Sequence, residues 1–100
     1  MTQSAAWQVL LEQNAPELMK VVSASRECVL PDGALSLKST KTLMSMLCDA
    51  LLGHDGGVTT IANRARAAGA TEEEIAETVG VAFLFGGMPA LVTGANAFKR

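Results

Sequence analysis

The chain has 100 residues, of which 49% are hydrophobic and 18% charged, and its formal net charge is −2. This length predicts a single domain over residues 1–100, and the apolar content excludes a disordered chain. Arg64 and Arg66 lie near each other but do not make the basic stripe that a nucleic-acid-binding surface needs.

Glycine and proline divide the sequence into helical pieces, and no segment alternates as a strand would. A short apolar stripe near the amino terminus ends close to Asn14. We expect Asn14 to cap a second helix, with Pro16 in its first turn and Glu17 at the capping-box position. This helix should end before Pro31, and its apolar residues are Leu18, Met19 and Val22.

The middle of the chain predicts two further helices. Ser36 or Ser39 is expected to open the first, and Gly53 to end it. The spacing of its apolar residues predicts a buried face made of Leu43, Met44, Leu47, Ala50 and Leu51. The next helix should follow Gly57 and end at Gly69, with an inward face made of Val58, Ile61, Ala62, Ala65 and Ala68.

The strongest local signal marks the start of the following helix. Thr71 is the predicted N-cap, and Glu74 completes a capping box three residues later. Four residues should form one buried face: Ile75, Val79, Ala82 and Phe83. The second half of this helix is apolar all round, which predicts burial on every side for Val81, Leu84 and Phe85. A last helix should start at Pro89 and show on one face Met88, Leu91, Val92, Ala95 and Phe98.

Residues 78–98 carry no charge and are about long enough to span a bilayer. Gly86, Gly87 and Pro89 interrupt this stretch, so we expect two short buried helices and no membrane. The amino terminus has no basic, apolar export signal, and two cysteines are too few for a disulfide scaffold, so a cytoplasmic protein is predicted. A chain this short cannot hide so much apolar surface within itself, which predicts a homo-oligomer.

Several segments, in this order, resemble the carboxymuconolactone decarboxylase and alkylhydroperoxidase D-like superfamily. They are Lys-Ser-Thr-Lys at 38–41, the apolar helix at 43–52, Ala-Arg-Ala-Ala-Gly-Ala-Thr-Glu-Glu-Glu-Ile-Ala-Glu at 65–77, and Phe-Gly-Gly-Met-Pro-Ala at 85–90. The resemblance covers residues 35–98. It implies an all-α domain of about five to six helices whose subunits form trimers or hexamers.

The redox branch of that superfamily has a Cys-x-x-Cys pair at a helix start, a histidine four residues later and a glutamate twelve residues earlier. A helix start lowers the pKa of a thiol, and a second thiol three residues on can close a disulfide. Aligned without gaps from Gly69, the two cysteine positions hold His54 and Gly57. The histidine and glutamate positions hold Ile61 and Thr42, so all four residues differ.

Two candidate catalytic residues remain. His54, the single histidine, is either a lone general acid or base at a helix start or an ordinary turn residue. Cys48 is either a reactive thiol or, as we expect, a small core residue. Cys28 has no evident activator. Asp49 is expected to lie on a wet helix stripe, and neither a metal site nor a cofactor is predicted.

Three functions stay open at this point. The first is a divergent, non-redox enzyme that uses His54 for proton transfer, and the second is a non-catalytic oligomeric binding or structural relative. The third is a peroxidase-type antioxidant, as the superfamily name implies. A small molecule is the expected kind of ligand. Because fold does not determine function, the choice among the three depends on the site.

Overall fold

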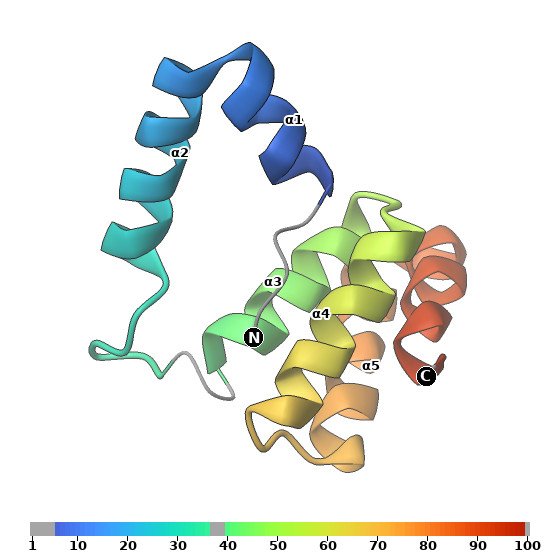
Figure 1. The fold of residues 1–100 in the computed structure, drawn as a ribbon. Coiled ribbons are helices and arrows are strands. Elements are labelled where there is room, and N and C mark those ends of the chain that lie inside the picture. Colours follow the sequence, from blue (N-terminus) through green and yellow to red (C-terminus); the bar gives the residue numbers. More distant parts are fainter. Residues whose placement is uncertain (1–5, 37–39, 100) are drawn as a thin grey trace. The chain divides into compact units, whose positions relative to one another are not determined.

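The computed structural model describes residues 6–36 and 40–99. Every regular element in these ranges is helical, which confirms the predicted all-α fold (Figure 1). In chain order the elements are α1 (Ala6–Asn14), α2 (Pro16–Val29), α3 (Thr42–Leu51), α4 (Asp55–Ala67), α5 (Glu72–Gly94) and the 3₁₀ helix η2 (Ala95–Phe98). They form two compact units, Met1–Pro31 and Asp32–Arg100.

The first unit is a helical hairpin of α1 and α2. Pro16 opens α2 as predicted, but Asn14 does not cap it: Asn14 is the last residue of α1, and its amide donates to the Leu10 carbonyl. The chain turns within one residue, Ala15, so Asn14 is still helical when α2 begins. Within the described part of this hairpin, Met19 is the one buried residue, and Arg26 stacks on Trp7.

The second unit is built around α3, which packs against both α4 and α5, while η2 packs against α4 (Figure 1). Its core combines a few large side chains with many alanines, which allow the helices to approach closely. The buried residues are Met46, Ala50, Val58, Ala62, Ile75, Val79, Ala82, Ala90 and Ala97.

Helix α3 is rotated relative to the predicted face. Met46 is fully buried and Thr42 nearly so, whereas Met44 and Leu51 are exposed, so the expectation for these last two was wrong. Because α3 is apolar on most of its circumference, the spacing of its residues allows more than one buried face. Ser36 does not open the helix, which begins at Thr42; Ser39 lies outside the described residues.

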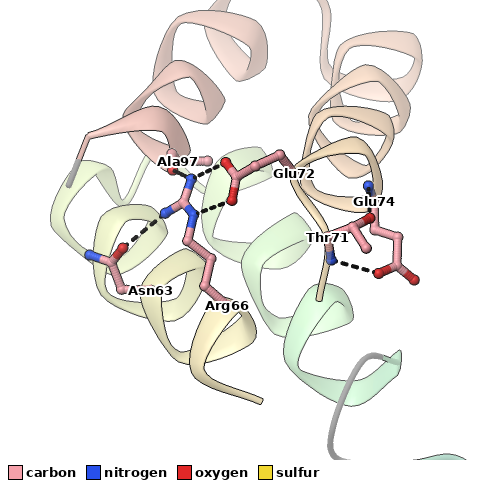
Figure 2. Close-up of polar contacts among 6 residues, drawn as sticks. All are labelled: Asn63, Arg66, Thr71, Glu72, Glu74 and Ala97. Carbon is pink, nitrogen blue, oxygen red and sulfur yellow. Dashed lines mark hydrogen bonds and ion pairs between the residues drawn. The ribbon is translucent and has the colours of Figure 1, made fainter. Parts of the chain in front are cut away.

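The junction between α4 and α5 follows the prediction. Gly69, with φ of 104°, ends the turn after α4, a conformation that suits glycine. The Thr71 hydroxyl accepts from the Glu74 backbone N–H at 3.1 Å, and the Glu74 carboxylate accepts from the Thr71 N–H at 2.7 Å (Figure 2). The predicted capping box is therefore confirmed, and it fixes the start of α5.

The predicted interruption near Pro89 is a kink at Gly87, whose φ of 70° and ψ of −158° leave the helical region. Burial around it was predicted wrongly. Leu84 and Phe85 are 76% and 83% exposed, and Val81, Phe83, Met88, Val92 and Phe98 are also exposed. One side of α5 packs on α3. Around the kink its buried residues are small, Ala82, Ala90 and Gly94, and the large side chains there are exposed. By length and hydropathy alone, residues 72–98 would pass as a membrane span, which is weak evidence.

Candidate functional site at the start of α4

The turn between α3 and α4 positions His54. Helix α3 ends at Leu51, and His54 is the residue that caps α4. The His54 backbone N–H donates to the Asp49 carbonyl oxygen at 2.9 Å, and the His54 carbonyl accepts from the Val58 N–H at 2.9 Å. Both backbone groups of His54 are therefore bonded, which fixes the point at which its side chain leaves the chain.

The imidazole of His54 pairs with the carboxylate of Asp49. Nδ1 of His54 lies 2.9 Å from Oδ1 of Asp49, and the two side chains are 56% and 25% exposed. A carboxylate accepts hydrogen bonds and cannot donate them. If the imidazole is neutral, its proton must therefore be on Nδ1, the nitrogen that faces Asp49. The other ring nitrogen, Nε2, is then a proton acceptor, and the side chain that carries it is half-exposed.

Asp49 also contacts the first turn of α4. The Asp49 carboxylate occupies the space that the β-carbon of any other residue at position 57 would need. The positive end of a helix dipole favours a negative charge at this place. Gly57 thus lets an anion approach the helix start, and that anion is the chain's own carboxylate.

Apolar side chains flank the histidine. Leu51 and Leu52 precede it and are exposed, and Cδ2 of Leu51 reaches the Gly86 backbone beside the kink of α5. The charged residues in the last turn of α3 and the first turn of α4 are Asp49 and Asp55, both acidic. In the chain, His54 therefore follows two exposed leucines and has an acidic residue on each side.

The structure shows where the four residues that the gapless alignment singled out lie. His54 and Gly57 stand at the start of α4, where the two thiols would be. Thr42 is buried at the start of α3, and Ile61 is half-buried in α4. Hydroxyl and aliphatic side chains at these positions cannot replace a glutamate and a histidine in moving protons.

Both cysteines lie within helices and are exposed. Cys48 is exposed on α3, so the expectation that it is a core residue was wrong: the rotation of α3 that buries Met46 turns Cys48 outward. Cys28 is exposed on α2, in the other compact unit. Since neither thiol stands at a helix start, neither gains the activation that such a position gives.

Sequence reasoning found His54 but missed Asp49, which was assigned to a wet helix stripe. The missed signal is the combination of an acidic residue in the last turn of one helix, a glycine turn and a histidine at the next helix start. Such a spacing can fold a carboxylate back onto the histidine. In the described residues no group of three potential metal ligands occurs, and this carboxylate–imidazole pair alone does not make a metal site.

A second polar cluster lies at the opposite end of α4 (Figure 2). Arg66, whose side chain is 15% exposed, donates to both carboxylate oxygens of Glu72, at 2.7 and 2.9 Å. It also donates to Asn63 Oδ1 at 2.8 Å and to the Ala97 carbonyl at 2.7 Å. The hydrogen bonding of Arg66 to the Glu72 carboxylate raises the pKa of Arg66 against the opposing effect of desolvation. This cluster ties α4, α5 and η2 together.

Comparison with known proteins agrees with this architecture. Residues 16–100 match the model of the carboxymuconolactone decarboxylase family. A carboxymuconolactone decarboxylase family protein from Legionella pneumophila superposes with a TM-score of 0.82 at 32% identity, covering 89% of this chain and 79% of that one. A carboxymuconolactone decarboxylase-type protein from Burkholderia xenovorans gives a TM-score of 0.86 at 28% identity, covering 94% and 74%. Among curated proteins no significant match is found.

Proposed function

The chain belongs to the carboxymuconolactone decarboxylase family, and we propose that it is a non-redox member in which His54 transfers protons to or from a bound small molecule. One observation carries the proposal, the 2.9 Å contact between Nδ1 of His54 and Oδ1 of Asp49. A proton carrier needs an imidazole whose second nitrogen is held by another group. Asp49 holds Nδ1 in this way.

The family name suggests the reaction in which such a proton is needed. When a carboxymuconolactone loses CO₂, the bond from the carbon to the carboxylate breaks and its electron pair stays on the substrate. The carbanion formed in this way must then receive a proton on carbon. A protonated His54 would donate it from Nε2 and recover a proton from solvent, with Asp49 stabilising the imidazolium.

The test compares the wild type with His54→Gln, using carboxymuconolactone as substrate and CO₂ release as the readout. Removing a general acid or base should slow turnover by about 10²–10⁴-fold. Thr60→Ala, an exposed position on the same helix, is the matched control and should keep the wild-type rate.

Equal rates for wild type and His54→Gln would contradict the proposal. If the wild type does not turn over the lactone, proton removal from 5-nitrobenzisoxazole, a general probe for a catalytic base, gives the second readout. A wild type that is no faster than His54→Gln there also contradicts it.

A second candidate function is a non-catalytic relative that acts by assembling with itself. The observation that favours it is the exposed apolar side of α5, which includes Leu84 and Phe85. Apolar surface of this kind is typical of subunit contacts. We propose a homotrimer or homohexamer for either function, with copies meeting through α5.

Light scattering tests the assembly. The expected mass is three or six times the chain mass of 10.4 kDa. Leu84→Glu should reduce that mass because it places a charge in the contact. Glu77→Gln, on the charged first half of the same helix, is the control and should leave the mass unchanged. A wild type at 10.4 kDa would contradict the proposal.

A further inference from the structure

The two neighbouring glycines at the start of α4 have different surroundings. A β-carbon built on Gly57 would lie 2.6 Å from Oδ2, 2.8 Å from Cγ and 3.2 Å from Oδ1 of Asp49. A β-carbon on Gly56 would meet no atom within 4 Å. Position 57 therefore has no room for a side chain while Asp49 keeps its place, and position 56 has room.

Backbone conformation does not explain the glycine at 57. The glycines with positive φ are Gly53, Gly69 and Gly87, so Gly57 keeps a conformation that any residue can adopt. Within a helix, glycine is less favourable than alanine because it loses more backbone entropy. Neither backbone conformation nor helix propensity therefore favours glycine at 57, and the feature that separates it from Gly56 is the Asp49 carboxylate in the space beside it.

The space at Gly57 is used by the carboxylate that holds His54. Residue 49 contacts residue 54 twice, through its carbonyl oxygen and through Oδ1, each at 2.9 Å. The backbone contact fixes the turn. The side-chain contact orients the ring, and it is made with the carboxylate lying in the gap over Gly57.

We propose that Gly57 is a positioning residue: the gap above it holds the Asp49 carboxylate, which keeps the proton of His54 on Nδ1 and leaves Nε2 as the atom that exchanges protons with substrate. This inference rests on the proposed function for the role of Nε2. Gly57 stands where the redox branch has its second thiol. In this chain the position contributes to proton transfer because it has no side chain and leaves room for Asp49.

The test is the tautomer of the imidazole. His54 is the single histidine of the chain, so its two ring nitrogens give unambiguous ¹⁵N NMR signals in the full-length protein. A free neutral imidazole prefers its proton on Nε2. We expect the wild type and Gly56→Ala to carry the proton on Nδ1, and Gly57→Ala and Asp49→Ala to revert to the Nε2 preference.

A double-mutant cycle covers the case in which Gly57→Ala is poorly folded. If the methyl group collides with the carboxylate, Gly57→Ala should lower the melting temperature in the wild-type background. The same change should be neutral or stabilising once Asp49 is alanine. Gly56→Ala should be neutral or stabilising in both backgrounds because its added methyl group meets open space.

The outcomes separate this inference from the proposed function. A Gly57→Ala protein that keeps the Nδ1 tautomer, or that loses equal stability with and without Asp49, overturns the role of Gly57. A Gly57-dependent tautomer together with an active His54→Gln variant leaves the positioning role intact and overturns the proton-transfer function.

Discussion

At its C-terminal end α4 carries Arg66, and all three nitrogens of this guanidinium donate hydrogen bonds within the protein. At its N-terminal end α4 starts from His54, one of whose ring nitrogens meets Asp49. Arg66 is mostly buried, whereas the His54 side chain is 56% exposed. The two ends of α4 therefore differ: the pair at the C-terminal end is mostly buried with several hydrogen bonds, and the pair at the N-terminal end is half-exposed with one side-chain hydrogen bond.

The difference indicates which pair holds the fold and which is free for chemistry. Arg66 joins three elements, and its partners use its hydrogen-bonding capacity, so it has little left for a ligand. His54 is held on one side through Nδ1, and its exposed ring makes no hydrogen bond at Nε2 to any of the described residues. A site that binds or reacts needs the second arrangement, while a structural contact benefits from the first.

The largest expected effect is at Arg66. Arg66→Ala removes two hydrogen bonds to Glu72 and leaves the Ala97 carbonyl without this donor, so we expect a loss of about 2 kcal/mol in the free energy of unfolding. Denaturant unfolding measures it. Arg64→Ala, an exposed arginine on the same helix, should cost less than about 0.5 kcal/mol. Equal losses would contradict the structural role of the Arg66 end.

The stabilising effect of the Arg66 pair should also be independent of pH near neutrality. Folding raises the pKa of Arg66. The resulting stabilisation is complete at pH values below the unfolded-state pKa, and it is lost only as the pH rises through the folded-state pKa. For arginine that range is strongly alkaline.

A smaller effect is expected from the capping box beside this cluster. Thr71→Ala removes the hydroxyl that accepts from the Glu74 N–H, and losing an N-cap of this kind costs about 1 kcal/mol. Thermal unfolding is the measurement. Thr71→Ser keeps the accepting oxygen and should recover most of the loss; failure of this rescue would show that the cap contributes little.

The opposite end of α4 should tolerate substitution. His54→Ala removes a half-exposed pair, and such pairs contribute less than about 1 kcal/mol, so the variant should unfold close to the wild type. Combined with a large loss of turnover in His54→Gln, this result would assign the residue to function. A loss as large as that of Arg66→Ala would place His54 among the structural contacts instead.

The smallest effect is expected at the exposed thiol next to Asp49. Cys48→Ser should change the free energy of unfolding by less than about 0.5 kcal/mol. We expect the wild type to reduce peroxide no faster than the uncatalysed background. The double variant Cys28→Ser/Cys48→Ser should then show the same rate. Clear peroxidase activity that the double variant loses while remaining folded would support the antioxidant alternative.

Local signals in the sequence predicted most of the helix ends. The capping box of Thr71 and Glu74 and the turn at Gly69 lie where expected because each depends on neighbouring residues alone. Asn14 failed as a cap because the turn at Ala15 is too short to free it from α1. Burial was harder to predict in α3 and α5, whose apolar residues surround the helix and mark no single face.

Residue order alone determined the all-α fold, the family and the position of His54 at a helix start, since helix signals and motif spacing are local properties. Only the tertiary structure showed that Asp49 folds back onto His54 and that Gly57 leaves room for it. These contacts depend on how α3 is rotated and how the turn joins it to α4. Tertiary packing likewise left Leu84 and Phe85 exposed. Around the kink of α5 small side chains face the core, and the large ones remain exposed.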